Sequence, residues 1–116
     1  MLNTINLNEG EQFKSDFKKI SPFSKIPVIK DHENNEITFE SGAILIYLAE
    51  KSGKYFDNEN RGYITQWLMA QMGYVGPILG QHHQFHHYNP GKSDFGEQRY
   101  FKISTSIYKN LDERLS

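Results

Sequence analysis

The chain has 116 residues, a formal net charge of -1 at pH 7 and no cysteine. The near-neutral charge argues against nucleic acid as a main partner, because nucleic-acid binding depends on clustered lysine and arginine. Without cysteine there is no disulfide framework, thiolate metal site or cysteine nucleophile. The N-terminal stretch has no basic region before an apolar run, and no stretch approaches the roughly 18 apolar residues of a membrane span. We therefore expect a cytoplasmic protein with neither nucleic acid nor a membrane as a partner.

The N-terminal residues predict a short strand followed by a short helix. Residues 3–7 alternate polar and apolar side chains, which predicts a short strand. Apolar residues from Phe13 to Ile20 recur at helical spacing and predict a short amphipathic helix. This helix ends before Pro22, because proline cannot continue it.

A hairpin followed by a helix is predicted next. Residues 26–29 and 37–39 are strand-like, and the Asp- and Asn-rich stretch 31–36 between them predicts a turn. A helix is predicted over 41–52, with Gly53 as its C-terminal cap. Apolar residues nearly encircle this helix, so we expect it to be well buried.

The second half of the chain is predicted to be helical. Residues 54–60 are polar and typical of a linker, and helical spacing of apolar residues follows from Ile64 to Met72. Four breakers interrupt this pattern, which predicts a kinked helix or two shorter ones. The breakers are Gly73, Gly76, Pro77 and Gly80. Residues 87–96 are predicted to form a loop before a last helix. That helix carries an apolar stripe of Tyr100, Ile103, Ile107, Leu111 and Leu115.

Pro27 stands at the front of the strand-like run 26–29. Proline removes a backbone donor, so within a sheet it is confined to an edge or to the first residue of a strand. A cis Ile26–Pro27 bond would turn the preceding backbone outward and leave its N–H and C=O free for an extended peptide ligand. The alternative is that Pro27 only starts a strand.

Glu40 and Ser41 precede the predicted helix and offer a second half-site. Ser41 is predicted to be the N-cap, and the first N–H groups of a helix attract a carboxylate. Glu40 beside it has the charge to hold an ammonium, so the pair is suited to the head group of an α-amino acid. The alternative is an ordinary serine cap with a helpful acid nearby.

Taken together, these two half-sites resemble the glutathione-binding half of the glutathione transferases. KIPVI at 25–29 is similar to that family's cis-proline strand, and FESGAILIYLAEK at 39–51 is similar to its Glu-Ser turn and following helix. The resemblance implies that the backbone of Ile26, next to Pro27, pairs with the cysteinyl part of glutathione. It also implies that Glu40 and Ser41 hold the γ-glutamyl head.

The segment 66–88 narrows the resemblance to one class of the family, because it is similar to the bacterial nu class. Members of that class resemble glutathione-dependent disulfide-bond oxidoreductases. The turn NEGEQF at 8–13 matches one in which a glutamine contacts glutathione, which here is Gln12. Arg99 lies in a helix that supplies a basic contact in some members. The implied cosubstrate is glutathione, and the implied chemistry is thiol transfer or disulfide reduction.

The family's organisation implies an α+β fold in two parts. Residues 1–54 are expected to form a partial thioredoxin-like, glutathione-binding unit, and residues 55–116 the first helices of an all-α C-terminal domain. The strand, helix and loop that carry the family's thiol-activating residue have no counterpart in this chain, so no catalytic residue is carried over. We expect either a folded unit that binds glutathione or a remnant that is inactive alone.

Four of the five histidines fall in HHQFHH, at positions 82, 83, 86 and 87. On a helix, His82 and His86 would share one face and His83 and His87 another, so each pair is suited to chelate a metal. A structural zinc site needs four ligands, and each face offers two, so no resident metal is expected. A metal-binding module is kept as an alternative function.

A non-catalytic partner protein is the third alternative. Aromatic residues and methionine are enriched at interfaces, and the helical segments carry Tyr63, Trp67, Met69 and Met72. These residues would suit a homodimer interface. For Trp67 we prefer a place in the core.

Overall fold

The computed structural model describes residues 2–116 of the chain. These divide into two compact units, up to Arg61 and from Gly62 to Ser116. The domain boundary predicted after Lys54 stays a prediction. Within residues 2–116, no helix is long and apolar enough to cross a membrane.

The first unit starts without the strand predicted at 3–7. The chain instead forms two short 3-10 helices, η1 (Leu7–Glu9) and η2 (Glu11–Phe13), followed by α1 (Ser15–Ile20). Asn6 explains the difference, because its polar groups bond locally. Its side chain accepts a hydrogen bond from the N–H of Asn8 at 3.1 Å, and its own N–H donates to the Glu11 carboxylate at 2.8 Å. These bonds replace the cross-strand bonds that a strand would need.

The predicted hairpin is confirmed. β1 (Val28–Lys30) pairs antiparallel with β2 (Ile37–Phe39), with Ile29 opposite Thr38. Two side chains build the turn: the carboxylate of Asp31 accepts from the N–H of Glu33 at 2.8 Å, and Asn34 accepts from the N–H of Glu36 at 2.9 Å. In residues 2–116 these two strands form the whole sheet.

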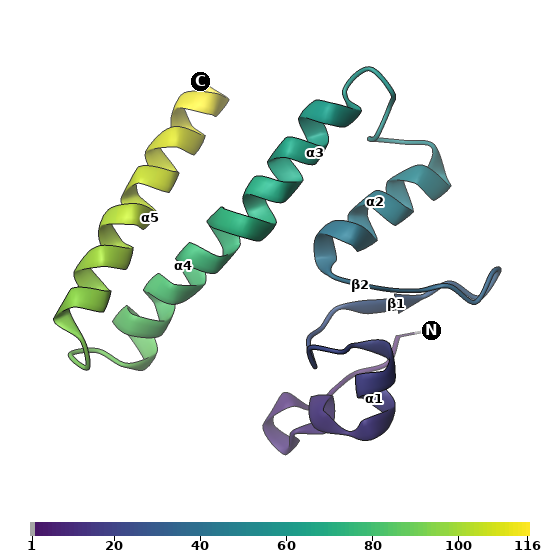
Figure 1. Cartoon of the computed structure of the whole chain (residues 1–116), viewed down its shortest axis with the longest axis horizontal. Coiled ribbons are helices and arrows are strands. Elements are labelled where there is room, and N and C mark those ends of the chain that lie inside the picture. The colour runs from purple at the N-terminus through teal and green to yellow at the C-terminus, as the bar shows by residue number, and fades with distance from the viewer. Residues whose placement is uncertain (1) are drawn as a thin grey trace. The chain divides into compact units, whose positions relative to one another are not determined.

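α2 (Ser41–Ser52) has the predicted bounds and packs on the hairpin (Figure 1). Gly53, with φ 67°, caps its C-terminus as predicted and donates to the carbonyls of Ala49 and Glu50. The expectation that α2 is well buried on nearly all sides is wrong. Ile44 is buried, but Leu45 and Leu48 are 54% and 49% exposed, because the hairpin covers only one side of the helix.

The second unit is a helical hairpin, and the predicted interruption is confirmed as two shorter helices. α3 (Arg61–Ala70) and α4 (Gly76–His83) are joined by the π-helical turn η3 (Gln71–Val75), and a second π turn, η4 (Gln84–Tyr88), follows. Gly76 donates its N–H to the carbonyl of Gln71, five residues back. The π turn thus accommodates the glycine and proline breakers without ending the helical path.

α5 (Asp94–Leu115) returns alongside α4 (Figure 1). The loop predicted at 87–96 is shorter in the structure, because η4 extends to Tyr88 and α5 begins at Asp94. Ser93 caps α5 by accepting from the N–H of Gly96 at 3.1 Å, and acidic Asp94 and Glu97 occupy the first turn, where the helix dipole favours them. These signals start the helix before Gly96.

The core of the second unit lies along the predicted α5 stripe. Ile107 is 2% exposed, and Phe85 stacks on Tyr100 with ring centroids 5.5 Å apart. Leu115, at the end of the stripe, is exposed. Gly96 is buried against the ring of Phe85, and a Cβ there would stand 2.7 Å from a ring carbon. The close approach of α5 to the end of the preceding helix therefore requires glycine.

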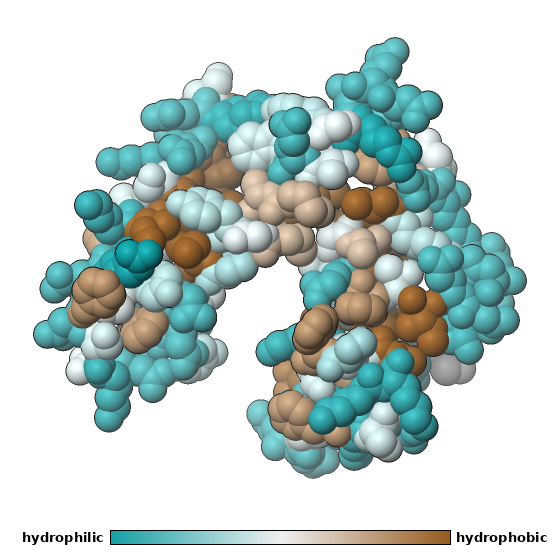
Figure 2. Space-filling model, in the orientation of Figure 1, coloured by the Kyte–Doolittle hydropathy of each residue, from teal (hydrophilic) through white to brown (hydrophobic). Residues whose placement is uncertain are grey.

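Trp67 does not lie in the core, so that preference is wrong. It is 38% exposed, and Tyr63 and Met69 on the same helix are 46% and 51% exposed. Arg114 of α5 lies over the rings of both Tyr63 and Trp67, at 5.3 and 5.7 Å from their centroids. A cation thus covers the indole in place of apolar packing. Apolar residues also reach the visible surface of both units in Figure 2.

Candidate functional site

The peptide bond between Ile26 and Pro27 is cis. β1 begins one residue later, at Val28, so Pro27 stands immediately before the strand and removes no hydrogen bond from the ladder. Ile26 is 51% exposed. The residue on the N-terminal side of the proline is therefore at the surface of the unit.

A small cavity of about 60 Å³ lies beside this bond. It brings together four of the residues predicted for the site: Ile26 and Pro27 from the hairpin entry, and Glu40 and Ser41 from the entry to α2. The remaining lining residues are Ser21, Lys25 and Phe39. Glu40 and Lys25 are the two charged residues of this lining.

Ser21 positions one wall of the cavity, and the sequence interpretation did not identify this role. It is 1% exposed, and its hydroxyl donates to the carbonyl of Lys25 at 2.7 Å and accepts from the N–H of Lys25 at 3.0 Å. These two bonds close the loop 21–25 that leads to Ile26. The sequence pattern predicts only that the first helix ends before Pro22, although serine is a common loop-closing residue.

Glu40, and not Ser41, is the N-cap of α2. The carbonyl of Glu40 accepts the first helical bond, from the N–H of Ile44 at 2.9 Å, and Ser41 is the first helical residue. Glu40 has φ 68° and ψ 121°, outside the ordinary regions for a residue with a side chain. The cap therefore stands one residue before the predicted Ser41, at the turn from β2 into α2.

The remaining two predicted residues lie outside this cavity. Gln12 lies on η2, where its amide nitrogen is 3.5 Å from the carbonyl of Leu7 and its side-chain oxygen is buried without a hydrogen-bond partner. Arg99 belongs to α5 in the second unit. There it lines a different cavity, of about 540 Å³, with Tyr74 and Lys102 among its neighbours.

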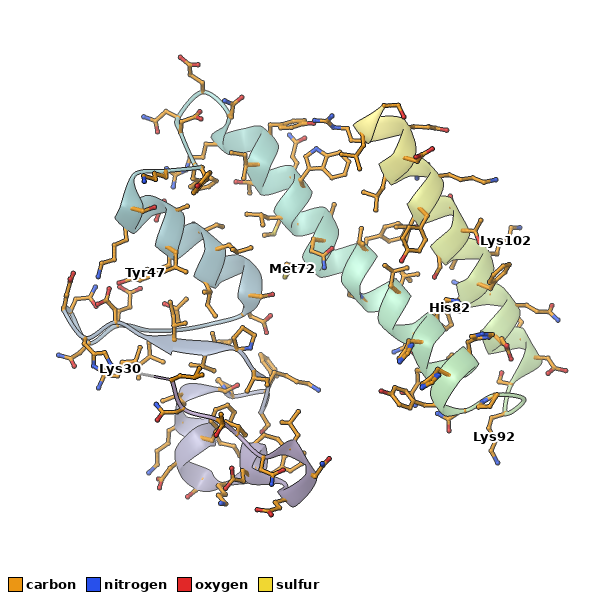
Figure 3. All side chains as sticks on the ribbon, turned by 180° about the vertical axis from the view of Figure 1, so that it is seen from behind. Lys30, Tyr47, Met72, His82, Lys92 and Lys102 are labelled. Atoms are coloured by element: carbon orange, nitrogen blue, oxygen red, sulfur yellow. The ribbon has the colours of Figure 1, made fainter. Side chains whose placement is uncertain are left out.

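A charged cluster fixes the hairpin turn to α2, and it was not predicted. The carboxylate of Asp31 accepts from the hydroxyl of Tyr47 at 2.5 Å and from the ammonium of Lys51, and Lys51 also pairs with Glu33 at 2.7 Å. Tyr47 lies on α2, in the same unit as the hairpin (Figure 3).

The cluster shifts the acidity of its members. The hydrogen bond from Lys51, followed by the one from Tyr47, holds the pKa of Asp31 well below its usual range. The hydrogen bonds to Asp31 and then Glu33 raise the pKa of Lys51, and the bond to Asp31 raises the pKa of Tyr47. Each shift favours the ionisation state that holds the hairpin and helix together.

The histidine pairs share faces as predicted. The rings of His82 and His86 have centroids 5.3 Å apart, and those of His83 and His87 are stacked at 4.7 Å. Within residues 2–116, no group of three or more His, Cys, Asp or Glu side chains converges in a way that would hold a metal ion.

Comparison with known proteins supports the family resemblance. A family model described as the N-terminal domain of glutathione S-transferase matches residues 2–50. The disulfide-bond oxidoreductase YfcG of Escherichia coli K12 is 42% identical over 118 aligned residues, covering 96% of this chain and 55% of the relative. YghU from the same organism, also named a disulfide-bond oxidoreductase, is 35% identical, covering 97% of this chain and 40% of the relative.

Solved structures are similar over nearly the whole chain. A glutathione transferase YghU from Streptococcus pneumoniae, complexed with glutathione, has a TM-score of 0.90 and 36% identity over 98% of this chain and 45% of its own. A glutathione transferase from Pseudomonas putida, with one glutathione disulfide bound per subunit, has a TM-score of 0.88 and 35% identity over 97% of this chain and 53% of its own.

These matches fix the fold, although the chain spans about half the length of the relatives. The first unit is the family's thioredoxin-like N-terminal unit, with a two-stranded sheet in residues 2–116, and the second carries helices of its all-α domain. The fold prediction is thus confirmed. Residues 2–50 match the N-terminal domain of glutathione S-transferase, and nearly the whole chain is similar to disulfide-bond oxidoreductases and glutathione transferases.

Proposed function

We propose that this chain binds glutathione in the cavity beside the cis Ile26–Pro27 bond. The observation that carries the proposal is the meeting of Ile26, Pro27, Glu40 and Ser41 around one cavity, although Ile26 and Ser41 are fifteen positions apart in sequence. Two similar solved structures hold glutathione or its disulfide, which supports the same ligand here.

The cavity suits the charged end of the tripeptide. A volume of about 60 Å³ takes a small charged group and not a whole tripeptide, so the remainder would extend along the surface at Ile26. The carboxylate of Glu40 would attract the ammonium of the γ-glutamyl head. The N–H groups at the start of α2 and the positive end of its dipole would attract the carboxylate of that head. The exposed backbone of Ile26 would pair with the cysteinyl part.

Gln12 and Arg99 stay proposed contacts that lie outside the cavity. Gln12 has a buried side-chain oxygen with no partner, and it would have to turn to meet a ligand. Arg99 belongs to the second unit, so the geometry of the first does not include it. We expect their substitution to weaken binding less than substitution of Glu40.

The proposed chemistry is thiol transfer or disulfide reduction, which follows the names of the curated relatives. The chain has no cysteine, so the sulfur that forms or breaks a disulfide bond would come from bound glutathione. No residue of the chain is assigned to activate that thiol. Binding is therefore the function proposed for the chain itself, and turnover is proposed for the family's longer members.

Amide NMR of the purified chain, titrated with glutathione and with its disulfide, tests the proposal. We expect saturable shifts at the amides of residues 26, 40 and 41. Glu40→Gln should weaken binding about tenfold, because it removes one charge-assisted hydrogen bond to the ammonium. Glu59→Gln changes the same functional group in the exposed linker and should leave binding unchanged.

Two results would contradict the proposal. One is a well-dispersed spectrum that neither form of glutathione perturbs. The other is an equal loss of affinity in both variants, which would indicate attraction by overall charge and not by this cavity.

A homodimer is proposed as the assembly state, supported by the exposure of Tyr63, Trp67 and Met69 on α3. Aromatic residues and methionine on one exposed helix are typical of an interface. Sedimentation of the chain at several concentrations distinguishes a dimer from a monomer. The cytoplasmic location stays a prediction.

A further inference from the structure

The HHQFHH segment places two histidine pairs on neighbouring faces of one helical path. His82 belongs to α4 and His86 to η4, and their rings are tilted by 32° with centroids 5.3 Å apart. Two nitrogens bound to one ion lie about 3 Å apart, since each imidazole binds at about 2.0–2.1 Å. Rings at this spacing are near enough for one nitrogen of each to bind a common ion.

Glu97 distinguishes the His82–His86 pair from its neighbour. Its carboxylate oxygen lies 2.9 Å from Nδ1 of His86, across from η4 to α5. A metal bound at Nε2 of a histidine leaves the proton on Nδ1, and a carboxylate that accepts this proton orients the ring and raises its basicity. His86 is 65% exposed, so an ion has access to its free nitrogen.

His82 supplies the second ring from a fixed position. It is half-buried, lies between the ribbons of α4 and α5 in Figure 3, and has its ring edge-on to Phe101 at 5.8 Å. Its Nδ1 is buried without a hydrogen-bond partner. The rings of His83 and His87 lie instead against Tyr88, at 4.8 and 5.1 Å, which is a neutral aromatic neighbour and not a carboxylate.

We propose that His82 and His86 form a two-imidazole site for a divalent transition-metal ion, and that Glu97 orients His86 within it. Copper(II) is the ion this site fits best. It binds nitrogen ligands most tightly of the divalent first-row ions, and a tetragonal ion accepts two neighbouring imidazoles with water in its other positions. A structural zinc ion, with four protein ligands, does not fit the two that this face offers. The site is independent of the proposed glutathione cavity, which lies in the first unit.

The test is a titration of the chain with Cu²⁺ alone, in the absence of glutathione, followed by electron paramagnetic resonance and by line broadening in the amide spectrum. His86→Gln and His87→Gln are a matched pair, because each removes one exposed imidazole from η4. We expect His86→Gln to abolish copper binding at the His82–His86 site, with loss of one nitrogen from the copper spectrum. His87→Gln should retain binding at that site. Glu97→Gln should lower the copper affinity of the His82–His86 site by about 10–100-fold, as for other second-sphere carboxylates.

The outcome is decisive in either direction. Equal weakening by His86→Gln and His87→Gln, or wild-type affinity in Glu97→Gln, overturns the assignment of the pair and of its orienting carboxylate. Copper binding that survives in His86→Gln, with the same spectrum, overturns the site itself. Substitution of His82 is less suitable because its ring packs on Phe101, so the exposed His86 carries the test, and the dispersion of the amide spectrum verifies that each variant is folded.

Discussion

Glu40 has both an unusual backbone conformation and a proposed role in ligand binding. It caps α2 through its backbone and lines the cavity, with φ 68° and ψ 121°. Such a backbone costs a residue with a side chain about 1–3 kcal/mol and persists only where the surroundings impose it. Here the end of β2 and the start of α2 impose it, so the residue proposed to hold the ligand is also a strained one.

Replacing Glu40 by glycine should therefore stabilise the first unit while it weakens binding. We expect Glu40→Gly to be about 1 kcal/mol more stable than Glu40→Gln, because glycine adopts positive φ at little steric cost. Urea denaturation followed by circular dichroism measures the difference. Both variants lack the carboxylate, so a comparison between them isolates the backbone contribution. Equal stability of the two variants would mean that the turn is not strained in solution.

Among the elements, a side-chain cluster holds the hairpin to α2, and a close approach at a glycine packs α5 against the segment before it. In the first unit, the Asp31–Tyr47–Lys51 cluster bridges residues that are far apart in sequence. In the second, α5 approaches Phe85 closely at Gly96. One contact depends on charge and the other on shape, so they respond to different changes.

The Asp31 cluster makes stability depend on acid pH. The pKa of Asp31 is lowered on folding, so its contribution is complete above its usual value of 3.8 and is lost as the pH falls below that value toward the folded pKa. We expect Asp31→Asn to be less stable than the wild type at pH 7 and to lose less stability between pH 5 and pH 2.

Thermal unfolding across this pH range measures the effect. Some acid dependence should remain in Asp31→Asn, because hydrogen bonds from Asn6 and Asn60 also lower the pKa values of Glu11 and Asp57. Asp16→Asn, in an exposed ion pair on α1, is the matched control and should change stability little. An Asp31→Asn curve parallel to that of the wild type would contradict the role of the cluster.

The Gly96 contact predicts opposite effects for the same substitution on two helices. Gly96→Ala should destabilise the chain by about 1–3 kcal/mol, because its new methyl group overlaps the ring of Phe85. Gly80→Ala on α4 meets no atom within 4 Å and should stabilise by up to about 1 kcal/mol through helix propensity. Urea denaturation checks both, and the same sign for both would refute the packing argument.

At the scale of the whole molecule, each compact unit has its own buried aliphatic side chain. Ile44 is 7% exposed in the first unit, and Ile107 is 2% exposed in the second. Trp67, the only tryptophan, lies in the second unit and reports on it. The two cores can therefore be probed separately within the intact chain.

We expect Ile44→Val and Ile107→Val each to destabilise its own unit by about 0.5–1.5 kcal/mol. Only Ile107→Val should shift the unfolding transition followed by Trp67 fluorescence, while amide signals of α2 follow Ile44→Val. The conservative change keeps both units folded. A shift of the Trp67 transition by Ile44→Val, equal to that by Ile107→Val, would show a single cooperative core in place of two.

Elements with local signals were predictable from the amino-acid sequence alone. The turn at 31–36 is built by Asp31 and Asn34 bonding to residues two positions on, and α2 ends at Gly53 because glycine readily adopts the left-handed conformation there. The motifs around Pro27 and Glu40 that resemble the family are also recognised from consecutive residues. Such features need only neighbouring residues, so pattern and residue type are sufficient to predict them.

Features that depend on distant partners emerged only in the folded structure. The 3–7 pattern formed no strand, because the sheet in residues 2–116 contains only β1 and β2 and Asn6 bonds locally instead. Glu40 replaced Ser41 as the cap of α2, at the turn from β2 into the helix. Burial of α2 and of Trp67 was overestimated, since hydropathy shows which faces are apolar and not what covers them. The same reason explains why the cavity walls at Ser21 and Lys25, and the pairing of His86 with Glu97, became visible only in three dimensions.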